Sequence, residues 1–176
     1  ILAEHLRQRA TGWLLALYDP EAVKVCASAG VGQPVEFPGG GKTDDLHGSP
    51  VTIRGEVRSL HDGRFIEPEI RHGGRRYHDQ GLTAVVRVEG STPDLENLLV
   101  LNSRRQMPFT LHQLISLGIY PERQRILVAK AAVAFRAAYE PIAGTILEVD
   151  SPGVTAVNPK RFRYRNAPPD LLGMNE

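Results

Sequence analysis

Short apolar runs and alternating stretches follow one another along the chain and predict an α/β fold. Residues 13–18 form a continuous apolar run, which is typical of a buried strand. Residues 51–60 alternate, with Val51, Ile53 and Val57 on one side and charged side chains on the other. Such alternation predicts a strand with one solvated face. The other expected strands are residues 35–37, 82–88, 98–101, 126–129 and 145–149.

Helix signals stand between these strands. Asp19 can cap a helix whose first residue is Pro20, and Gly30 supplies a left-handed C-terminal stop. Cys26 falls on the apolar face of this helix and is predicted to be a buried, unreactive side chain. Further helices are expected after the capping box of Thr110 and Gln113 and at residues 1–10, which fit the end of a preceding helix. The alanine-rich residues 130–139 could form a helix or a loop, and propensity favours a helix.

The turn at residues 61–63 predicts a β-hairpin in which residues 64–70 return beside residues 51–60. A polar loop over residues 71–81 follows it. Without an internal repeat or a linker, the chain is expected to form one α/β domain over residues 1–176. This domain would have a mixed sheet, short helices and a central β-hairpin, and its end, 166–176, would be a loose tail.

Composition limits the function without naming it. The chain has 41% hydrophobic and 23% charged residues, as is usual for a globular domain. Its 21 basic and 20 acidic side chains give a net charge of +1, which favours neither nucleic acid nor an anionic membrane. One cysteine excludes a disulfide framework, and no apolar run is long enough to span a membrane. We therefore expect a soluble protein in the reducing cytoplasm.

The most unusual local sequence is the glycine-rich stretch at residues 38–45. It does not match a phosphate-binding loop, because Glu36 stands where the first glycine is needed and no helix pattern follows Thr43. Its bare backbone and one lysine could instead contact a substrate carboxylate, and a flexible connector is the alternative. The candidate residues are Gly40, Gly41, Lys42 and Asp44, with Asp44 as the partner that orients Lys42.

Other chemistry is sparse in the sequence. None of the six histidines has the spacing of a zinc site, and no nucleophile elbow is present. We therefore predict no metal site and no self-contained hydrolase within this chain. Basic and aromatic residues alternate at 160–165, as in a base-stacking segment or a solvated strand. Because the net charge is close to zero, no nucleic-acid partner is expected.

Several motifs occur in a fixed order between about residues 13 and 165. They are Asp19-Pro20-Glu21-Ala22-Val23, Ala29-Gly30-Val31-Gly32, Gly40-Gly41-Lys42, Gly48-Ser49-Pro50-Val51, Gly55-Glu56-Val57, Leu60-His61-Asp62-Gly63-Arg64-Phe65, Lys130, Phe135-Arg136-Ala137-Ala138 and Val149-Asp150-Ser151-Pro152-Gly153. In this order they resemble the C-terminal region of the MlrC family, the microcystin-degradation-type zinc metallopeptidases. Microcystin itself is not implied as the substrate, because a shared fold does not determine a substrate.

Two positions depart from the family's pattern. The family places a serine after the late lysine and a histidine before Phe-Arg-Ala, where this chain has Ala131 and Ala134. The family's zinc ligands belong to a larger N-terminal domain, which nothing in this chain matches. The resemblance thus implies zinc and a metal-bearing N-terminal domain in the parent protein. The start at Ile1 fits either a chain cut from such a protein or a gene that holds this part alone.

The resemblance implies a C-terminal domain of a zinc-dependent peptidase or amidohydrolase, which packs on the metal domain and completes one wall of the substrate cleft. By itself the chain would be inactive. A stand-alone, non-catalytic binding or assembly module of the same fold is the alternative. A homo-oligomer is also expected, formed through an exposed apolar segment with Leu2 and Leu6. The candidate substrate-binding cations are Lys42, Arg104, Lys130 and Arg136.

Overall fold

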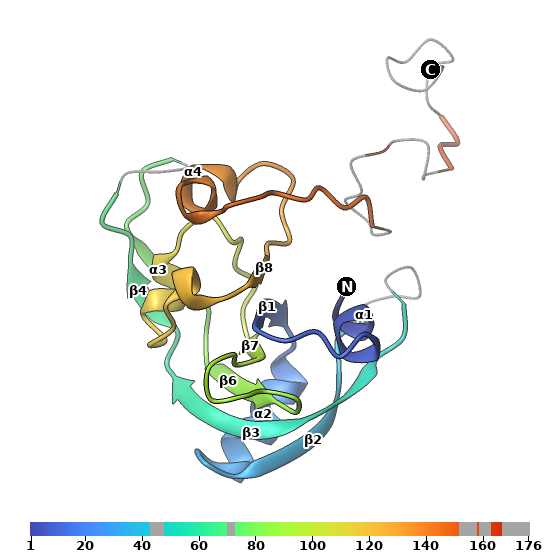
Figure 1. Cartoon of the computed structure of the whole chain (residues 1–176). Coiled ribbons are helices and arrows are strands. Elements are labelled where there is room, and N and C mark those ends of the chain that lie inside the picture. Colours follow the sequence, from blue (N-terminus) through green and yellow to red (C-terminus); the bar gives the residue numbers. More distant parts are fainter. Residues whose placement is uncertain (43–47, 70–72, 152–157, 159–162, 167–176) are drawn as a thin grey trace.

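The computed structural model describes residues 1–42, 48–69, 73–151, 158 and 163–166, which form strands and short helices (Figure 1). The strands are β1 (Trp13–Tyr18), β2 (Pro34–Gly39), β3 (Val51–His61), β4 (Arg64–Ile66), β5 (Tyr77–Asp79), β6 (Thr83–Val88), β7 (Leu98–Asn102) and β8 (Ile126–Val128). The helices are α1 (Leu2–Arg7), α2 (Pro20–Ala29), α3 (His112–Ile115), η1 (Pro121–Arg123), α4 (Arg136–Tyr139) and η2 (Glu140–Ile142).

A six-stranded mixed sheet organises the domain. Its strand order is β2-β3-β6-β7-β1-β8, and β4 pairs with β5 in a separate two-stranded sheet. Strand β1 runs parallel to both β7 and β8, whereas the pairs β2–β3, β3–β6 and β6–β7 are antiparallel. The predicted α/β domain with a mixed sheet and short helices is confirmed.

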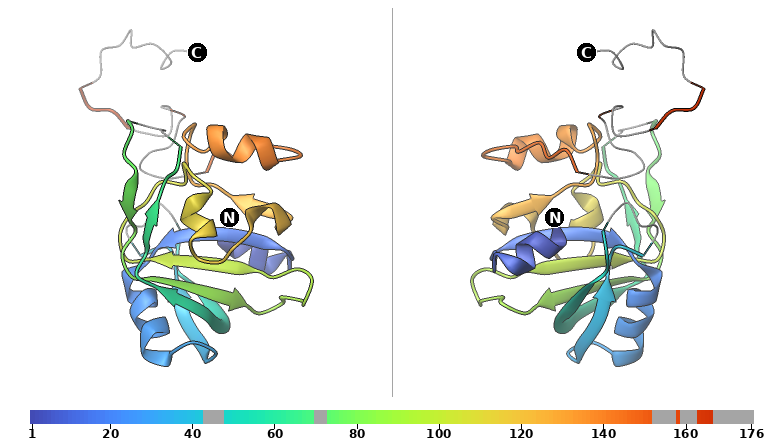
Figure 2. Two further views of the ribbon diagram at one scale, coloured as in Figure 1. Left: turned by 90° about the vertical axis from the view of Figure 1, so that its left-hand side faces the viewer. Right: turned by 90° about the vertical axis from the view of Figure 1, so that its right-hand side faces the viewer.

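Helices cover both faces of the sheet. Helix α2 packs on one face, and α3 and α4 lie over the other (Figure 2). Trp13 and Leu15 of β1 therefore pack in the core that contains α2, while Leu14 packs with Leu114 of α3. Because each face of β1 meets apolar side chains, the strand needs the continuous apolar run seen in the sequence.

The N-terminal capping signal of α2 acts as predicted, whereas Gly30 ends the helix in another conformation than expected. The Asp19 carboxylate accepts a hydrogen bond from the Ala22 N–H (3.1 Å), and Pro20 is the first helical residue. Gly30 ends the helix with φ +90° and ψ 163°, so it uses the positive φ open to glycine but not the left-handed helical conformation. Cys26 is fully buried, as predicted, and burial raises the pKa of its thiol to about 11.

The hairpin predicted between residues 51–60 and 64–70 is wrong. Strand β6 pairs with residues 55–61 of β3, the part next to the turn, and β2 pairs with residues 51–56 on the other edge. Instead β4 leaves the sheet and pairs with β5, with Phe65 opposite His78. The supposed polar loop at 71–81 thus contains a strand, and β6 and β7 form the hairpin at the centre of the large sheet. Residue 70 lies outside the described residues.

Three further predictions need correction: the helix over residues 130–139, the capping box, and the exposed apolar segment at the N-terminus. Residues 130–139 form only the single turn of α4. The Thr110 hydroxyl accepts from the His112 N–H, while the Gln113 amide is buried and donates to Gln80, so no capping box forms. Leu2 is buried, and Leu6 packs against the core, so the N-terminal segment does not present the apolar patch expected for self-association.

Residues 145–149 form no strand, although their sequence predicts one. The described chain pairs no strand with them. Part of the motif at 149–153, most of the basic and aromatic stretch at 160–165, and the end after residue 166 lie outside the described residues.

The alternation of β3 yields a stability prediction. Val57 is fully buried, and Thr52 is exposed on the same strand. Val57→Asp should lower the free energy of unfolding by several kcal/mol, because it buries a carboxylate without a partner. Thr52→Asp should change it by less than about 0.5 kcal/mol. Urea unfolding of both variants checks the register, and equal midpoints would contradict it.

Burial of Cys26 yields a second prediction. A thiol with a pKa of about 11 and no exposed surface offers almost no thiolate to a reagent at pH 8. We expect negligible modification by a disulfide reagent in the folded chain and complete modification in denaturant. Rapid modification of the folded chain would show that α2 does not pack on the sheet as described.

Candidate functional site

The carboxyl ends of β1, β7 and β8, together with the residues that directly follow them, lie at one edge of the sheet, called here the carboxyl edge. After β1 the chain enters α2 on one face, and after β7 it leads to α3 on the other. Ligands of α/β sheets bind at the carboxyl ends of strands whose connections leave on opposite faces. The end of β1 and β7 is therefore the candidate site.

Asp19 joins three segments at this edge through its carboxylate and its backbone N–H. It is only 3% exposed. Besides capping α2, it accepts from the Gly40 N–H (3.3 Å) and from Lys42 Nζ (2.8 Å). Its own N–H donates to the Asn102 carbonyl at the end of β7 (3.1 Å). The carboxylate thus connects α2 with the glycine-rich stretch, and the backbone N–H of the same residue connects both to the end of β7.

The glycine-rich stretch reaches Asp19 because the sheet curls. Strand β2 is separated from β1 by three strands, and yet its last residues meet the end of β1. Gly41 has φ +59°, and a Cβ there would lie 2.6 Å from the Ser49 carbonyl carbon. The glycine therefore allows a close approach, as its sequence suggests, but the neighbouring backbone is the chain's own.

Lys42 is held by acidic residues that follow β1. Its ammonium lies 2.8 Å from Asp19 and 3.5 Å from Glu21, and its side chain is 24% exposed. Asp44, the partner suggested by the sequence, lies outside the described residues. Sequence reasoning assigned Asp19 only as a helix cap and so missed its pairing with Lys42.

Two arginines follow β7. Arg104 forms an ion pair with Asp79 of β5 and keeps a largely exposed side chain. The Arg105 guanidinium lies over the Tyr18 ring, 4.3 Å from its centroid, and Tyr18 is the last residue of β1. Sequence reasoning named neither Arg105 nor Tyr18, although Tyr18 is the last residue of a predicted strand and Arg105 follows another within four residues.

The remaining predicted cations differ in position. Lys130 is exposed two residues after β8, so it belongs to the carboxyl edge. Arg136 begins α4, and its ion pairs in the described chain are with Glu140 and Glu148, not with other candidates. The structure thus gathers Gly40, Gly41, Lys42, Arg104 and Lys130 at one edge and leaves Arg136 in a cluster of its own.

A buried amide network supports the end of β7. Gln80 Oε1 accepts from Asn102 Nδ2 (2.7 Å) and from Gln113 Nε2 (3.1 Å). All three side chains are at most 3% exposed. A buried polar network of this kind fixes one arrangement of the groups that share it. It therefore keeps the start of the segment with Arg104 and Arg105 in a defined position.

The described residues do not provide a zinc site. No three His, Cys, Asp or Glu side chains in that part of the chain come close enough to hold an ion. His61 contacts the Ser59 hydroxyl (2.9 Å), and burial lowers its pKa. The His78 ring stacks on Phe65 and meets the edge of Phe109. We therefore assign no metal-dependent step to these residues.

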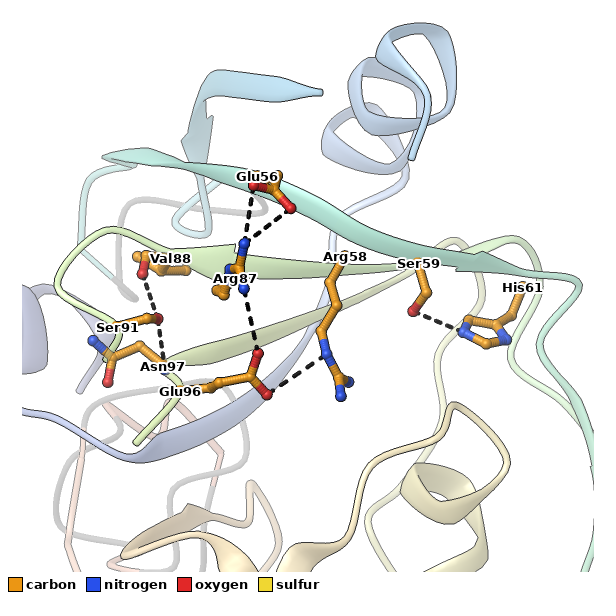
Figure 3. A network of polar contacts seen from close by, with 9 residues as sticks. All are labelled: Glu56, Arg58, Ser59, His61, Arg87, Val88, Ser91, Glu96 and Asn97. Atoms are coloured by element: carbon orange, nitrogen blue, oxygen red, sulfur yellow. Dashed lines mark hydrogen bonds and ion pairs between the residues drawn. The ribbon is translucent and has the colours of Figure 1, made fainter. Parts of the chain in front are cut away.

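A second group of charges lies at the amino end of β7, away from the carboxyl edge. Arg87 pairs with Glu56 (3.0 Å) and with Glu96 (4.0 Å), and Arg58 pairs with Glu96 (3.6 Å) (Figure 3). Opposite charges alternate here, and the side chains are partly exposed, so each pair contributes little to stability. The network gives β3 and β6 their polar face and presents no excess charge to a ligand.

Comparisons with known proteins agree with this fold. The family model described as the MlrC C-terminus matches residues 1–166. The crystal structure of a putative metallopeptidase from Mesorhizobium sp. BNC1 superposes with a TM-score of 0.79 at 25% sequence identity. The match covers 96% of this chain and 33% of that chain, so this chain spans one third of the neighbour's length. No curated protein matches it. In the described part, every helix is too short or too polar to cross a membrane.

The several contacts of Asp19 predict unequal effects of its variants. Asp19→Ala should lower the free energy of unfolding by about 2 kcal/mol or more, because the helix cap is lost and the partners of the carboxylate lose their acceptor. Asp19→Asn keeps an oxygen for capping and should cost less.

Glu21→Gln is the matched control, since Glu21 is mostly exposed and lies farther from Lys42. Its effect should stay within about 0.5 kcal/mol. Chemical denaturation of the three variants provides the comparison. If Asp19→Ala proved as mild as Glu21→Gln, Asp19 would not hold the edge together.

Proposed function

The chain belongs to the MlrC C-terminus family, and from this premise we propose that it is the C-terminal domain of a zinc-dependent metallopeptidase or amidohydrolase. In this proposal it packs on a metal-bearing N-terminal domain and forms one wall of the substrate cleft. The putative metallopeptidase of similar fold supports this assignment, because this chain corresponds to only one third of it. The zinc would be held by the preceding domain, since the described residues gather no ligand set.

The observation that carries the proposal is the concentration of cations at the carboxyl edge. Four cations lie there. Arg104 and Arg105 follow β7, Lys130 follows β8, and Lys42 is bound to Asp19, which follows β1. Peptides and their cleavage products carry carboxylates, and hydrolysis develops negative charge on the attacked carbonyl oxygen. Fixed cations stabilise both kinds of charge.

The geometry of each cation suits binding. An ammonium has three N–H donors. Asp19 and Glu21 can take two of those of Lys42, which leaves one for a ligand. The Arg104 guanidinium has five donors, and its ion pair with Asp79 leaves most of the side chain exposed. Both groups are thus oriented by an acidic partner and still able to bind a substrate oxygen.

These residues bind and orient a substrate and do not transfer protons. Ala131 and Ala134 supply neither the hydroxyl nor the imidazole that the resemblance implies there. The same two alanines favour the alternative, a non-catalytic module that uses the cationic edge to bind an anionic ligand. Zinc content and peptide hydrolysis by the longer protein separate the two functions. A cytoplasmic setting stays a prediction from the single cysteine.

Kinetics of the longer protein test the proposal. Lys42→Ala and Arg104→Ala should each raise KM for a peptide substrate about tenfold, as expected when a contact worth about 1.4 kcal/mol is lost. A fall in kcat as well would show that the contact strengthens in the transition state.

Arg54→Ala serves as the control. Arg54 pairs with Glu36 on the outer strands and is exposed, so it should leave both constants unchanged. If KM and kcat of both edge variants stayed within twofold of the values of the unmodified protein, the carboxyl edge would not be part of the substrate cleft.

A further inference from the structure

Residues 145–149 have the sequence of a strand and no strand beside them in the described chain. Thr145, Ile146 and Val149 are β-branched, as strand residues commonly are. The segment is not helical and follows the extended Ala143. An unpaired segment of this composition leaves its backbone N–H and C=O groups available for pairing.

Two residues of the segment contact the domain, and the other three are exposed. Ile146 is half-buried, and Glu148 pairs with Arg136 of α4. Thr145, Leu147 and Val149 are exposed, with Leu147 at 82% and Val149 at 65%. Ile146 and the ion pair of Glu148 thus hold the segment against the domain, while Leu147 and Val149 present two apolar side chains to the outside.

Exposed apolar side chains are concentrated in this part of the chain. Among the described large hydrophobic residues the four most exposed are Leu147, Tyr77, Val133 and Val149, and three of these lie within residues 133–149. Single exposed apolar side chains are common on any protein, whereas a concentration of them marks an interaction surface. We call residues 145–149 the docking segment.

We propose that the docking segment pairs with an edge strand of the metal-bearing domain that precedes this region, and that Leu147 and Val149 pack against that domain. The inference rests on the proposed function. Addition of an extended segment to a sheet edge is a common mode of recognition, in which backbone hydrogen bonds contribute affinity and alternate side chains contribute specificity.

Two observations favour this occupant. About two thirds of the putative metallopeptidase of similar fold lies outside the region that this chain matches. Figures 1 and 2 also place the end of the docking segment on the side of the molecule where the N-terminus lies. A domain joined to the N-terminus can therefore reach the segment without a long connection.

Hydrogen exchange compares the 176-residue chain with the longer protein that contains the preceding domain. The amides of residues 145–149 should exchange rapidly in the chain alone and at least about a hundredfold more slowly in the longer protein. Leu147→Asp should abolish that protection. Val31→Asp, a change at an exposed valine elsewhere on the domain, should not.

In the isolated chain both variants should shift the unfolding temperature by less than about 2 °C, which separates docking from folding. Rapid exchange of residues 145–149 in the longer protein would overturn the inference. If that protein still held zinc and cleaved peptides, the proposed function would stand without it. Slow exchange with neither zinc nor activity would preserve the docking and refute the peptidase. A dimer of the isolated chain that Leu147→Asp disrupts would assign the segment to a second copy and overturn the inference as well.

Discussion

The arrangement of the carboxyl edge depends on the buried Asp19 carboxylate, which has three partners from two parts of the chain. At 3% exposure its charge would be costly without hydrogen bonds or a cation. The start of α2, the Gly40 N–H and the Lys42 ammonium supply these contacts. The same carboxylate that begins a helix therefore also closes the curl of the sheet and holds a lysine at the carboxyl edge.

Two further features of the fold hold the carboxyl edge in place. The Gln80 amide network fixes the end of β7, and the parallel pairing of β1 with β7 places Tyr18 beside Asn102. Arg105 can then lie over the Tyr18 ring, and Arg104 can reach Asp79. The cations thus project from a rigid base, which is what charge-based binding of a substrate requires.

Local sequence patterns correctly predicted the elements that are determined by residues close together in the sequence. Strand β1, helix α2 with Asp19 and Gly30, and the alternation of β3 are of this kind. The predictions were wrong where contacts with residues distant in the sequence determine the local structure. The hairpin after β3 failed because β6 occupies the edge it needed, and the Gln113 cap failed because Gln80, 33 positions earlier, binds that amide.

The candidate site was predictable only in part for the same reason. Gly40, Gly41, Lys42, Arg104 and Lys130 were named from their residue types and from the family resemblance, and they share one edge in the structure. The pairing of Lys42 with Asp19 spans 23 positions and depends on the curl of the sheet, which no local pattern encodes. Arg105 and Tyr18 likewise meet only because β1 and β7 are neighbours.

The most direct test of the central claim is a crystal structure of the longer protein with its metal centre. We expect the metal centre to face the carboxyl edge of β1 and β7, with Lys42 and Arg104 lining the same cleft. A metal centre at the opposite end of the sheet, beside Arg87 and Glu96, would contradict it.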